Sequence, residues 1–324
     1  MISRLALINA AGVAAALGLA VVVAARGAPP AIVMQPAAAA SLELVALPGG
    51  GRGLRDATDH VVELRAYRRI LAASTLADRL LHELAEPDRV VGVTAYGRAE
   101  SPWAYQQTDK PALSGVDDVE AVLSLSPDLV ILNSVGQTSK VARLRERGIE
   151  VFDLGEMRGA DMLVRDIHIV ATLLGHPERG QRLATAWQRR FAAVDAALGG
   201  RARKRAVYLS TYGGKVFGGT RGSSYGDILA AAGVVDVAAA DYQGWPQYDA
   251  EQLLRLDPDL VITKPGMGAE LCRIPGLERL RGCRAPGGFV EIEGAVLDDP
   301  GLAMLDAAEQ IFAVAYPDTP LHTR

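Results

Sequence analysis

Residues 118–132 read DVEAVLSLSPDLVIL, and residues 249–263 read DAEQLLRLDPDLVIT. Nine of these 15 positions are identical, and the two copies start 131 residues apart. That separation is far longer than the period of a solenoid repeat. In each copy an Asp can cap a short helix, a Pro ends the helix, and a Leu-Val-Ile run follows that is typical of a buried parallel strand. The repeat therefore predicts two similar α/β domains.

The segments that flank the two copies alternate between strand and helix patterns. The strands are expected at 69–73, 89–93, 128–132, 150–153, 206–210, 215–217, 260–263 and 288–292. Helical patterns at 75–85 and 137–147 lie between them. Such alternation predicts parallel sheets with helices on both faces and crevices at the carboxyl ends of the strands.

Residues 160–200 show helical spacing of apolar residues and no strand pattern, with a break at Gly175-His176-Pro177. We therefore expect an α/β fold of two Rossmann-like lobes with parallel sheets, joined by a long connecting helix. The expected segments are a signal peptide or membrane anchor (1–40), a flexible spacer (41–55), an N-terminal α/β lobe (56–158), a helical connector (159–200) and a C-terminal α/β lobe (201–324).

The N-terminal segment has the form of an export signal. An apolar run of 21 residues, Leu5–Ala25, lies between Arg4 and Arg26, and the small residues Ala38-Ala39-Ala40 offer a cleavage site. Export with cleavage is the favoured interpretation, which places the body in the periplasm or another extracytoplasmic space. A run of this length would also span a bilayer, so an uncleaved anchor is the alternative.

Composition excludes several classes of protein. The 324 residues carry a formal net charge of −4, which disfavours a general nucleic-acid binder, and 49% hydrophobic residues exclude a disordered chain. Two cysteines cannot form a four-thiolate metal site, and the five histidines are scattered, so no metal site is expected. Cys272 and Cys283 lie 11 positions apart, and an oxidising compartment favours a disulfide between them over two separate buried thiols.

One class of protein to consider is an enzyme whose active site lies in a cleft between two α/β lobes. The chain contains neither a glycine-rich phosphate loop of the usual forms nor a Gly-x-Ser-x-Gly elbow. The acidic pair Asp298-Asp299 is interpreted as a cap before a final helix at 301–316. These observations count against an enzyme.

These features resemble the periplasmic substrate-binding proteins of the cobalamin and ferric-siderophore uptake family. The similarity covers roughly residues 56–317, and the Glu-x-x-x-x-Leu-x-Pro-Asp-Leu-Val-Ile element in each lobe is its most specific mark. The stretch GSSYGDIL, starting at Gly222, resembles the turn of the second lobe into a helix. The chain departs from the family near residues 74–79, where Arg79 stands in place of Glu.

The resemblance implies that Glu120 and Glu251 dock into arginine pockets on the two permease subunits of an ABC importer. One carboxylate in the first helical turn of each lobe would suit a partner with two-fold symmetry, and the protein itself is expected to be a monomer. The alternative role of both residues is helix-dipole stabilisation alone, worth about 0.3–1 kcal/mol.

Aromatic and cationic side chains on the predicted loops form the candidate ligand site. Rings on loops suit a large, flat or partly apolar ligand, and cations would match the oxygens of an anionic chelate. Each ring could instead fold onto the surface of its own lobe, and each Arg could be a solvated surface residue. The candidates are Tyr96, Arg98, Trp103, Tyr212, Arg221, Tyr225, Trp245 and Tyr248.

The expected ligand is a metal-centred organic chelate, and no covalent cofactor is expected. Trp245-Pro246-Gln247 and the stretch 91–96 resemble the vitamin B12-binding members, while ferric siderophores are the commoner cargo of the family. Haem ranks third, because no Tyr or His precedes the first-lobe Glu in the stretch 115–118. Free zinc or manganese is disfavoured. An anchored binder or sensor that never meets a permease is a further alternative.

Overall fold

The computed structural model describes residues 43–99, 109–114, 118–133, 138–155, 159–299 and 301–321. The chain divides into two compact units, Met1–Pro36 and Ala37–Arg324, and every described residue belongs to the second. Among these residues, no helix is long and apolar enough to cross a membrane. The run Leu5–Ala25, interpreted as a signal or anchor, lies outside the described residues.

The first lobe is built on a five-stranded sheet in the order β6-β5-β4-β7-β8, and all four pairings are parallel, as predicted. Its strands are β4 (Ile70–Ala72), β5 (Val90–Thr94), β6 (Ala112–Leu113), β7 (Leu129–Leu132) and β8 (Val151–Asp153). Its helices are α2 (Thr75–Leu84), η1 (Pro87–Arg89), α3 (Ala95–Ala99), α4 (Val119–Ser124) and α5 (Thr138–Glu146). Every residue of β7 is buried, which explains its unbroken apolar sequence.

The second lobe contains a four-stranded parallel sheet in the order β12-β9-β14-β15. Its strands are β9 (Arg205–Tyr208), β12 (Val235–Asp236), β14 (Leu260–Thr263) and β15 (Phe289–Glu291). Its helices are α8 (Ser224–Ala231), α9 (Ala250–Leu256), α10 (Met267–Leu271), η3 (Leu277–Arg279), α11 (Arg281–Arg284) and α12 (Gly294–Leu297). The predicted fold class of two parallel-sheet lobes is therefore confirmed.

The two copies of the repeat make the same contacts. Asp118 and Asp249 cap α4 and α9, accepting hydrogen bonds from Ala121 N (3.0 Å) and Gln252 N (2.8 Å). Just beyond each helix, Ser126 (φ 45°) and Asp257 (φ 44°) adopt the left-handed conformation that turns the chain toward the next strand.

An arginine holds this turn in each lobe, directly before β4 in the first lobe and at the start of β9 in the second. In the first lobe, Arg69 donates from Nε to Ser126 O (2.9 Å) and from Nη2 to Leu125 O (2.5 Å). In the second lobe, Arg205 donates to Asp257 O (3.4 Å) and Leu256 O (2.7 Å). These bonds satisfy carbonyl groups that the end of a helix leaves without partners.

An aspartate completes each turn. Asp128 accepts from the backbone N–H of Arg69 (2.9 Å), and Asp259 accepts from that of Arg205 (3.0 Å). We call this set of bonds, in either lobe, the arginine clamp. It joins the first strand of the lobe to the unit of helix, turn and strand that the repeat encodes.

Two segments differ from their predicted structure. Residues 215–217 form a strand, but β11 (Lys215–Phe217) pairs antiparallel with β10 (Ser210–Tyr212) and β13 (Gln247–Tyr248), outside the parallel sheet. Gly213 (φ 57°) and Gly214 (φ 72°) supply the positive φ angles of the tight turn that reverses the chain.

The second difference lies in the segment 41–55, which was predicted to be a flexible spacer. Part of it is β1 (Leu44–Ala46) and β2 (Arg52–Arg55), which pair antiparallel, and β3 (Val61–Glu63) completes the small sheet. Leu54 is only 1% exposed, so burial of this side chain fixes β2 against the rest of the lobe.

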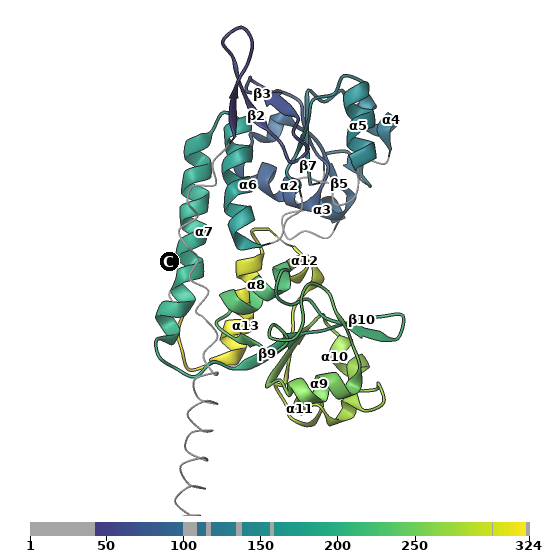
Figure 1. The fold of residues 1–324 in the computed structure, drawn as a ribbon, viewed down its shortest axis with the longest axis vertical. Helices are drawn as coiled ribbons and strands as arrows, with labels where there is room; N and C mark the ends of the chain where they lie inside the picture. The colour runs from purple at the N-terminus through teal and green to yellow at the C-terminus, as the bar shows by residue number, and fades with distance from the viewer. Residues whose placement is uncertain are drawn as a thin grey trace, which may run out of the picture. The chain divides into compact units, whose positions relative to one another are not determined.

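Two consecutive helices follow the first lobe, with the predicted break at Gly175-His176-Pro177 between them. They are α6 (Ala160–Leu173) and the 22-residue α7 (Pro177–Leu198), which lie side by side (Figure 1). At its start α7 is tied to the first lobe, where Arg179 donates to Glu86 (2.9 Å). Further along, Arg190 pairs with Asp306 (2.6 Å) and Glu309 (2.9 Å).

The last helix, α13 (Met304–Ala315), starts three residues later than predicted, and the acidic pair before it is not its cap. Asp299 instead accepts from Gly301 N at 2.6 Å, within the turn that precedes the helix. Asp298 bonds to Tyr225 and Lys264, which belong to other parts of the second lobe.

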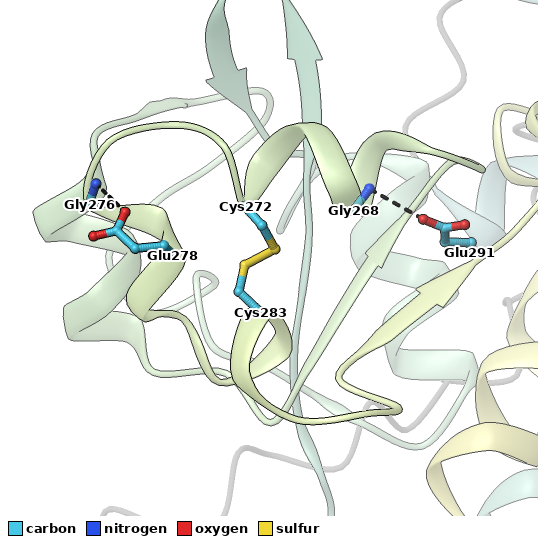
Figure 2. The surroundings of a disulfide bond; sticks show 6 residues. All are labelled: Gly268, Cys272, Gly276, Glu278, Cys283 and Glu291. Atoms are coloured by element: carbon cyan, nitrogen blue, oxygen red, sulfur yellow. Dashed lines mark hydrogen bonds between the residues drawn. A yellow bond between two sulfur atoms is a disulfide. The ribbon is translucent and has the colours of Figure 1, made fainter.

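The predicted disulfide between Cys272 and Cys283 is confirmed (Figure 2). The cysteines lie at the end of α10 and within α11, and their Cα atoms are 5.6 Å apart. Beside the bridge, Leu271, Leu277 and Leu280 are buried in the same core cluster as Leu253 of α9. The bridged segment is thus part of the packed lobe.

Candidate functional site

Three aromatic rings gather at the carboxyl end of β9 in the second lobe. Tyr208, the last residue of that strand, stacks on Tyr225 of α8 with ring centroids 4.0 Å apart and planes at 14°. Trp245 lies against both rings, at 5.0 Å from Tyr225 and 5.7 Å from Tyr208. Tyr208 is buried, whereas Trp245 remains 48% exposed. Trp245 therefore presents an apolar surface to solvent on a rigid aromatic support, which we call the aromatic platform.

A glycine makes this close packing possible. A Cβ atom on Gly219 would lie 2.5 Å from Cδ2 of Tyr225 and 2.8 Å from Cζ3 of Trp245. Both distances are shorter than van der Waals contact, so any larger residue at position 219 must displace one of the rings.

A polar network anchors the platform from below. The Tyr225 hydroxyl donates to Oδ1 of Asp298 (2.8 Å), and the other carboxylate oxygen of Asp298 pairs with the ammonium of Lys264. Burial raises the pKa of Tyr225 and raises the pKa of Tyr208 to about 12. Both phenols therefore stay protonated at neutral pH, and Tyr225 remains a hydrogen-bond donor that orients its ring.

Arg221 lies beside the platform because two backbone hydrogen bonds join its turn to the turn that carries Trp245. Thr220 N donates to Gly244 O (3.0 Å), and Gly244 N donates to Arg221 O (2.9 Å). The Arg221 side chain is exposed. An exposed cationic residue thus lies on the turn that is bonded to the turn of Trp245.

In the first lobe, Tyr96 and Arg98 lie on α3, directly after β5. Thr94 starts this helix, since its hydroxyl accepts from Gly97 N (2.9 Å) while Asp78 accepts from the hydroxyl and the backbone N–H of Thr94. Tyr96 is half-buried, and exposed Arg98 donates to the backbone carbonyl of Lys110 (3.1 Å). Trp103, a further candidate, lies outside the described residues.

Two candidates do not join the platform. Tyr248 is only 4% exposed and packs edge-on against Tyr242 (5.0 Å) within the core, so its ring is not presented to a ligand. Tyr212 is 82% exposed at the tip of the β10–β11 hairpin, where it lines a separate hollow of about 330 Å³ together with Glu270 and Ile274.

The two predicted docking carboxylates occupy matching positions, in the first turns of α4 and α9. Glu120 and Glu251 are both exposed, and Glu251 makes a loose ion pair with Arg255 at 3.5 Å. Because Asp118 and Asp249 already cap these helices, neither glutamate is needed as a cap.

The ligand-site candidates chosen from the sequence leave out three members of the site: Tyr208, Lys264 and Asp298. Lys264 had a usable signal, since it directly follows the predicted parallel strand 260–263, at the end where such folds place their sites. Tyr208 lies inside the predicted strand 206–210, and only the structure shows that the strand ends at this residue. Asp298 had no such signal, because only the tertiary structure brings it beside Tyr225. Within the described residues, no cluster of His, Cys, Asp and Glu could hold a metal ion.

Comparisons with known proteins identify the family of the chain. Residues 70–279 match the model of a family described as periplasmic binding protein. The cobalamin-binding protein of Halobacterium salinarum is 29% identical over 216 residues, which are 64% of this chain and 57% of that relative. The vitamin B12-binding protein of Salmonella typhimurium is 27% identical over 185 residues, or 57% of this chain and 68% of the relative.

A solved structure shares the fold. The periplasmic heme-binding protein RhuT from Roseiflexus, in its apo form, aligns with a TM-score of 0.67 and 23% identity, covering 76% of this chain and 99% of that one. At this level of identity the likeness concerns the fold alone.

Replacing Gly219 with Ala should disrupt the platform. The added Cβ must push Tyr225 or Trp245 aside, so we expect a loss of about 1–3 kcal/mol in the free energy of unfolding, together with altered tryptophan fluorescence. Gly200→Ala is the control, since its Cβ would meet no atom within 4 Å. Unchanged stability and fluorescence in G219A would contradict the packing described here.

Asp78→Asn should weaken the pH dependence of stability. Burial raises the pKa of Asp78 from 3.8 to about 7, so the folded state keeps a proton that the unfolded state releases. The retained proton stabilises the folded state, and this stabilisation is complete below about pH 4 and is lost as the pH rises to about 7. Urea denaturation across this range should show a smaller decline in D78N than in the wild type. If the free energy of unfolding declined equally in D78N and the wild type, groups other than Asp78 would be responsible for the pH dependence.

Proposed function

Because the chain belongs to the periplasmic binding protein family, we propose that it is an extracytoplasmic solute-binding protein that captures a metal-centred organic chelate and delivers it to an ABC importer. The single observation that carries this proposal is the aromatic platform, an exposed Trp245 held rigidly on Tyr225 and Tyr208. A preorganised aromatic surface binds a large flat ligand with little loss of side-chain entropy.

Among such chelates we propose a corrinoid first. Two relatives are named for binding cobalamin or vitamin B12, and an apolar surface of this kind suits the face of a macrocycle. Arg221 at the edge of the platform would then meet a polar or anionic substituent of the ligand. Tyr96 and Arg98 of the first lobe, and Trp103, are proposed as contacts from the opposite lobe.

A ferric siderophore is the second candidate, and the cationic edge formed by Arg221 favours it. Siderophores present charged oxygen atoms that a guanidinium can match. Haem is the third candidate. For each of them the cargo is bound and released without chemical change, and no catalytic residue is assigned.

We further propose that Glu120 and Glu251 dock the protein onto the permease dimer of the importer. Their support is geometric, since each is exposed in the first turn of a helix that already has its own aspartate cap.

The first 40 residues would direct export, with either cleavage or retention as an anchor. The mass of the mature N-terminus separates a secreted binder from an anchored one.

Titration against cobalamin, a set of ferric siderophores and haem tests the ligand proposal. We expect tight binding to one class, and Trp245→Ala should lower the affinity for it at least about tenfold. Tyr212→Ser is the control, because it removes an exposed ring of the same lobe that lies outside the platform. The proposal would be contradicted if the protein bound no ligand of the panel, or if W245A and Y212S lost affinity equally.

Charge reversal tests the docking proposal. The double variant E120K/E251K should abolish uptake in cells that depend on this protein while leaving ligand affinity unchanged, because neither residue lies at the platform. The variant E146K/D318K, which reverses two other exposed carboxylates, is the control. Normal uptake by E120K/E251K would show that the glutamates do not dock.

A further inference from the structure

The disulfide-bridged segment carries a concentration of positive charge. Residues 272–284, here called the arginine loop, contain four arginines and one acid, whereas the whole chain has a net charge of −4. All four arginines are exposed. The loop is therefore a basic surface on an acidic protein.

Most of this charge is not neutralised within the molecule. Arg281 pairs with Asp257 and with Asp259, as part of the region around the second arginine clamp. The one acid of the loop, Glu278, accepts a hydrogen bond from Gly276 N at 2.7 Å (Figure 2). Arg273, Arg279 and Arg284 form no ion pair with any carboxylate in the part of the chain that the structure describes.

The bridge and the core hold these three arginines in place. Arg273 and Arg284 each follow a bridged cysteine, and the Cα atoms of the two cysteines are 5.6 Å apart. Arg279 lies between Leu277 and Leu280 of the buried core, next to α9. The positive groups are thus presented by a rigid backbone.

An exposed aromatic ring lies next to this basic surface. Tyr212, 82% exposed, lines the hollow that Ile274 of the arginine loop also lines. The acid in the hollow, Glu270, accepts a hydrogen bond from Thr211 (2.8 Å). A tyrosine combines an apolar ring with a polar tip, a pairing that suits the interface between a bilayer and water.

We propose that the arginine loop and Tyr212 form a surface that binds anionic phospholipid headgroups. Guanidinium groups match phosphate oxygens, and each basic residue close to an anionic bilayer adds to the attraction. A bilayer surface offers partners to both kinds of group, since its phosphates match the guanidinium groups and its interface accommodates the exposed ring. The apolar run Leu5–Ala25, if retained, would keep the body within reach of a bilayer.

The orientation of this surface fits the docking role proposed for α9. A Cβ on Gly276 would lie 2.9 Å from Cβ of Ala250, the residue before Glu251. A lobe that approached a membrane-embedded permease through Glu251 would therefore carry the arginine loop on the side of the protein that faces the permease and its membrane. That orientation rests on the proposed function, but lipid binding itself requires neither ligand nor importer.

Flotation with lipid vesicles tests the proposal on the compact unit Ala37–Arg324, which lacks the apolar run. We expect binding to vesicles of phosphatidylcholine with phosphatidylglycerol, no binding to phosphatidylcholine alone, and loss of binding at high salt. The variant R273Q/R279Q/R284Q should lower binding at least about tenfold, and Tyr212→Ser should lower it further.

The control variant R143Q/R147Q/R182Q removes three other exposed arginines and should bind as the wild type does. Circular dichroism establishes that each variant is folded. Unchanged binding in the ligand panel separates a failure of the lipid proposal from a failure of the proposed function. The proposal is overturned by equal losses in the two triple variants, by equal binding to neutral vesicles, by no binding at all, or by retention on polyglutamate without binding to vesicles.

Discussion

The arginine clamp is the interaction on which each lobe depends. A helix ends with carbonyl groups that have no partner within the helix and that need another donor. Arg69 and Arg205 satisfy these carbonyls, while Asp128 and Asp259 accept hydrogen bonds from the backbone N–H groups of the same two arginines. The clamp therefore fixes the direction in which the repeated strand enters its sheet.

The position of the site follows from that constraint. Once β9 and β14 are held parallel, their carboxyl ends bring Tyr208 and Lys264 to the same edge of the second sheet. Helix α8 adds Tyr225, and the turn after Gly244 adds Trp245. The platform is an aromatic surface assembled from three separate segments, and Gly219 leaves room for its rings. Its rigidity comes from stacking and from the Asp298 network, which leaves the outer face of Trp245 available to a ligand.

The fold was largely predictable because its signals are local. The repeated Pro-Asp-Leu-Val-Ile element, the helix break at Gly175-His176-Pro177 and the two cysteines each correspond to a feature of the structure. The predictions from the sequence were wrong where the pairing of distant segments decided the structure. Residues 215–217 have the composition of a strand in any sheet, and only their pairing with residues 210–212 and 247–248 makes the sheet antiparallel. Leu54 likewise gave no sign that it would be buried and would order the segment around it.

By itself, the sequence determined the two-lobe α/β organisation, the matched helix caps with their exposed glutamates and the choice of Tyr225, Trp245 and Arg221 as candidates. Helix caps, helix breaks and buried strands depend on residues that are neighbours in the sequence, so they can be predicted from the sequence alone. Only the tertiary structure decided that Tyr248 is core, that Tyr212 lies on a separate hairpin and that Asp298 holds Tyr225. Burial and side-chain contact depend on residues far away in the chain, and no local pattern specifies which of those will be neighbours.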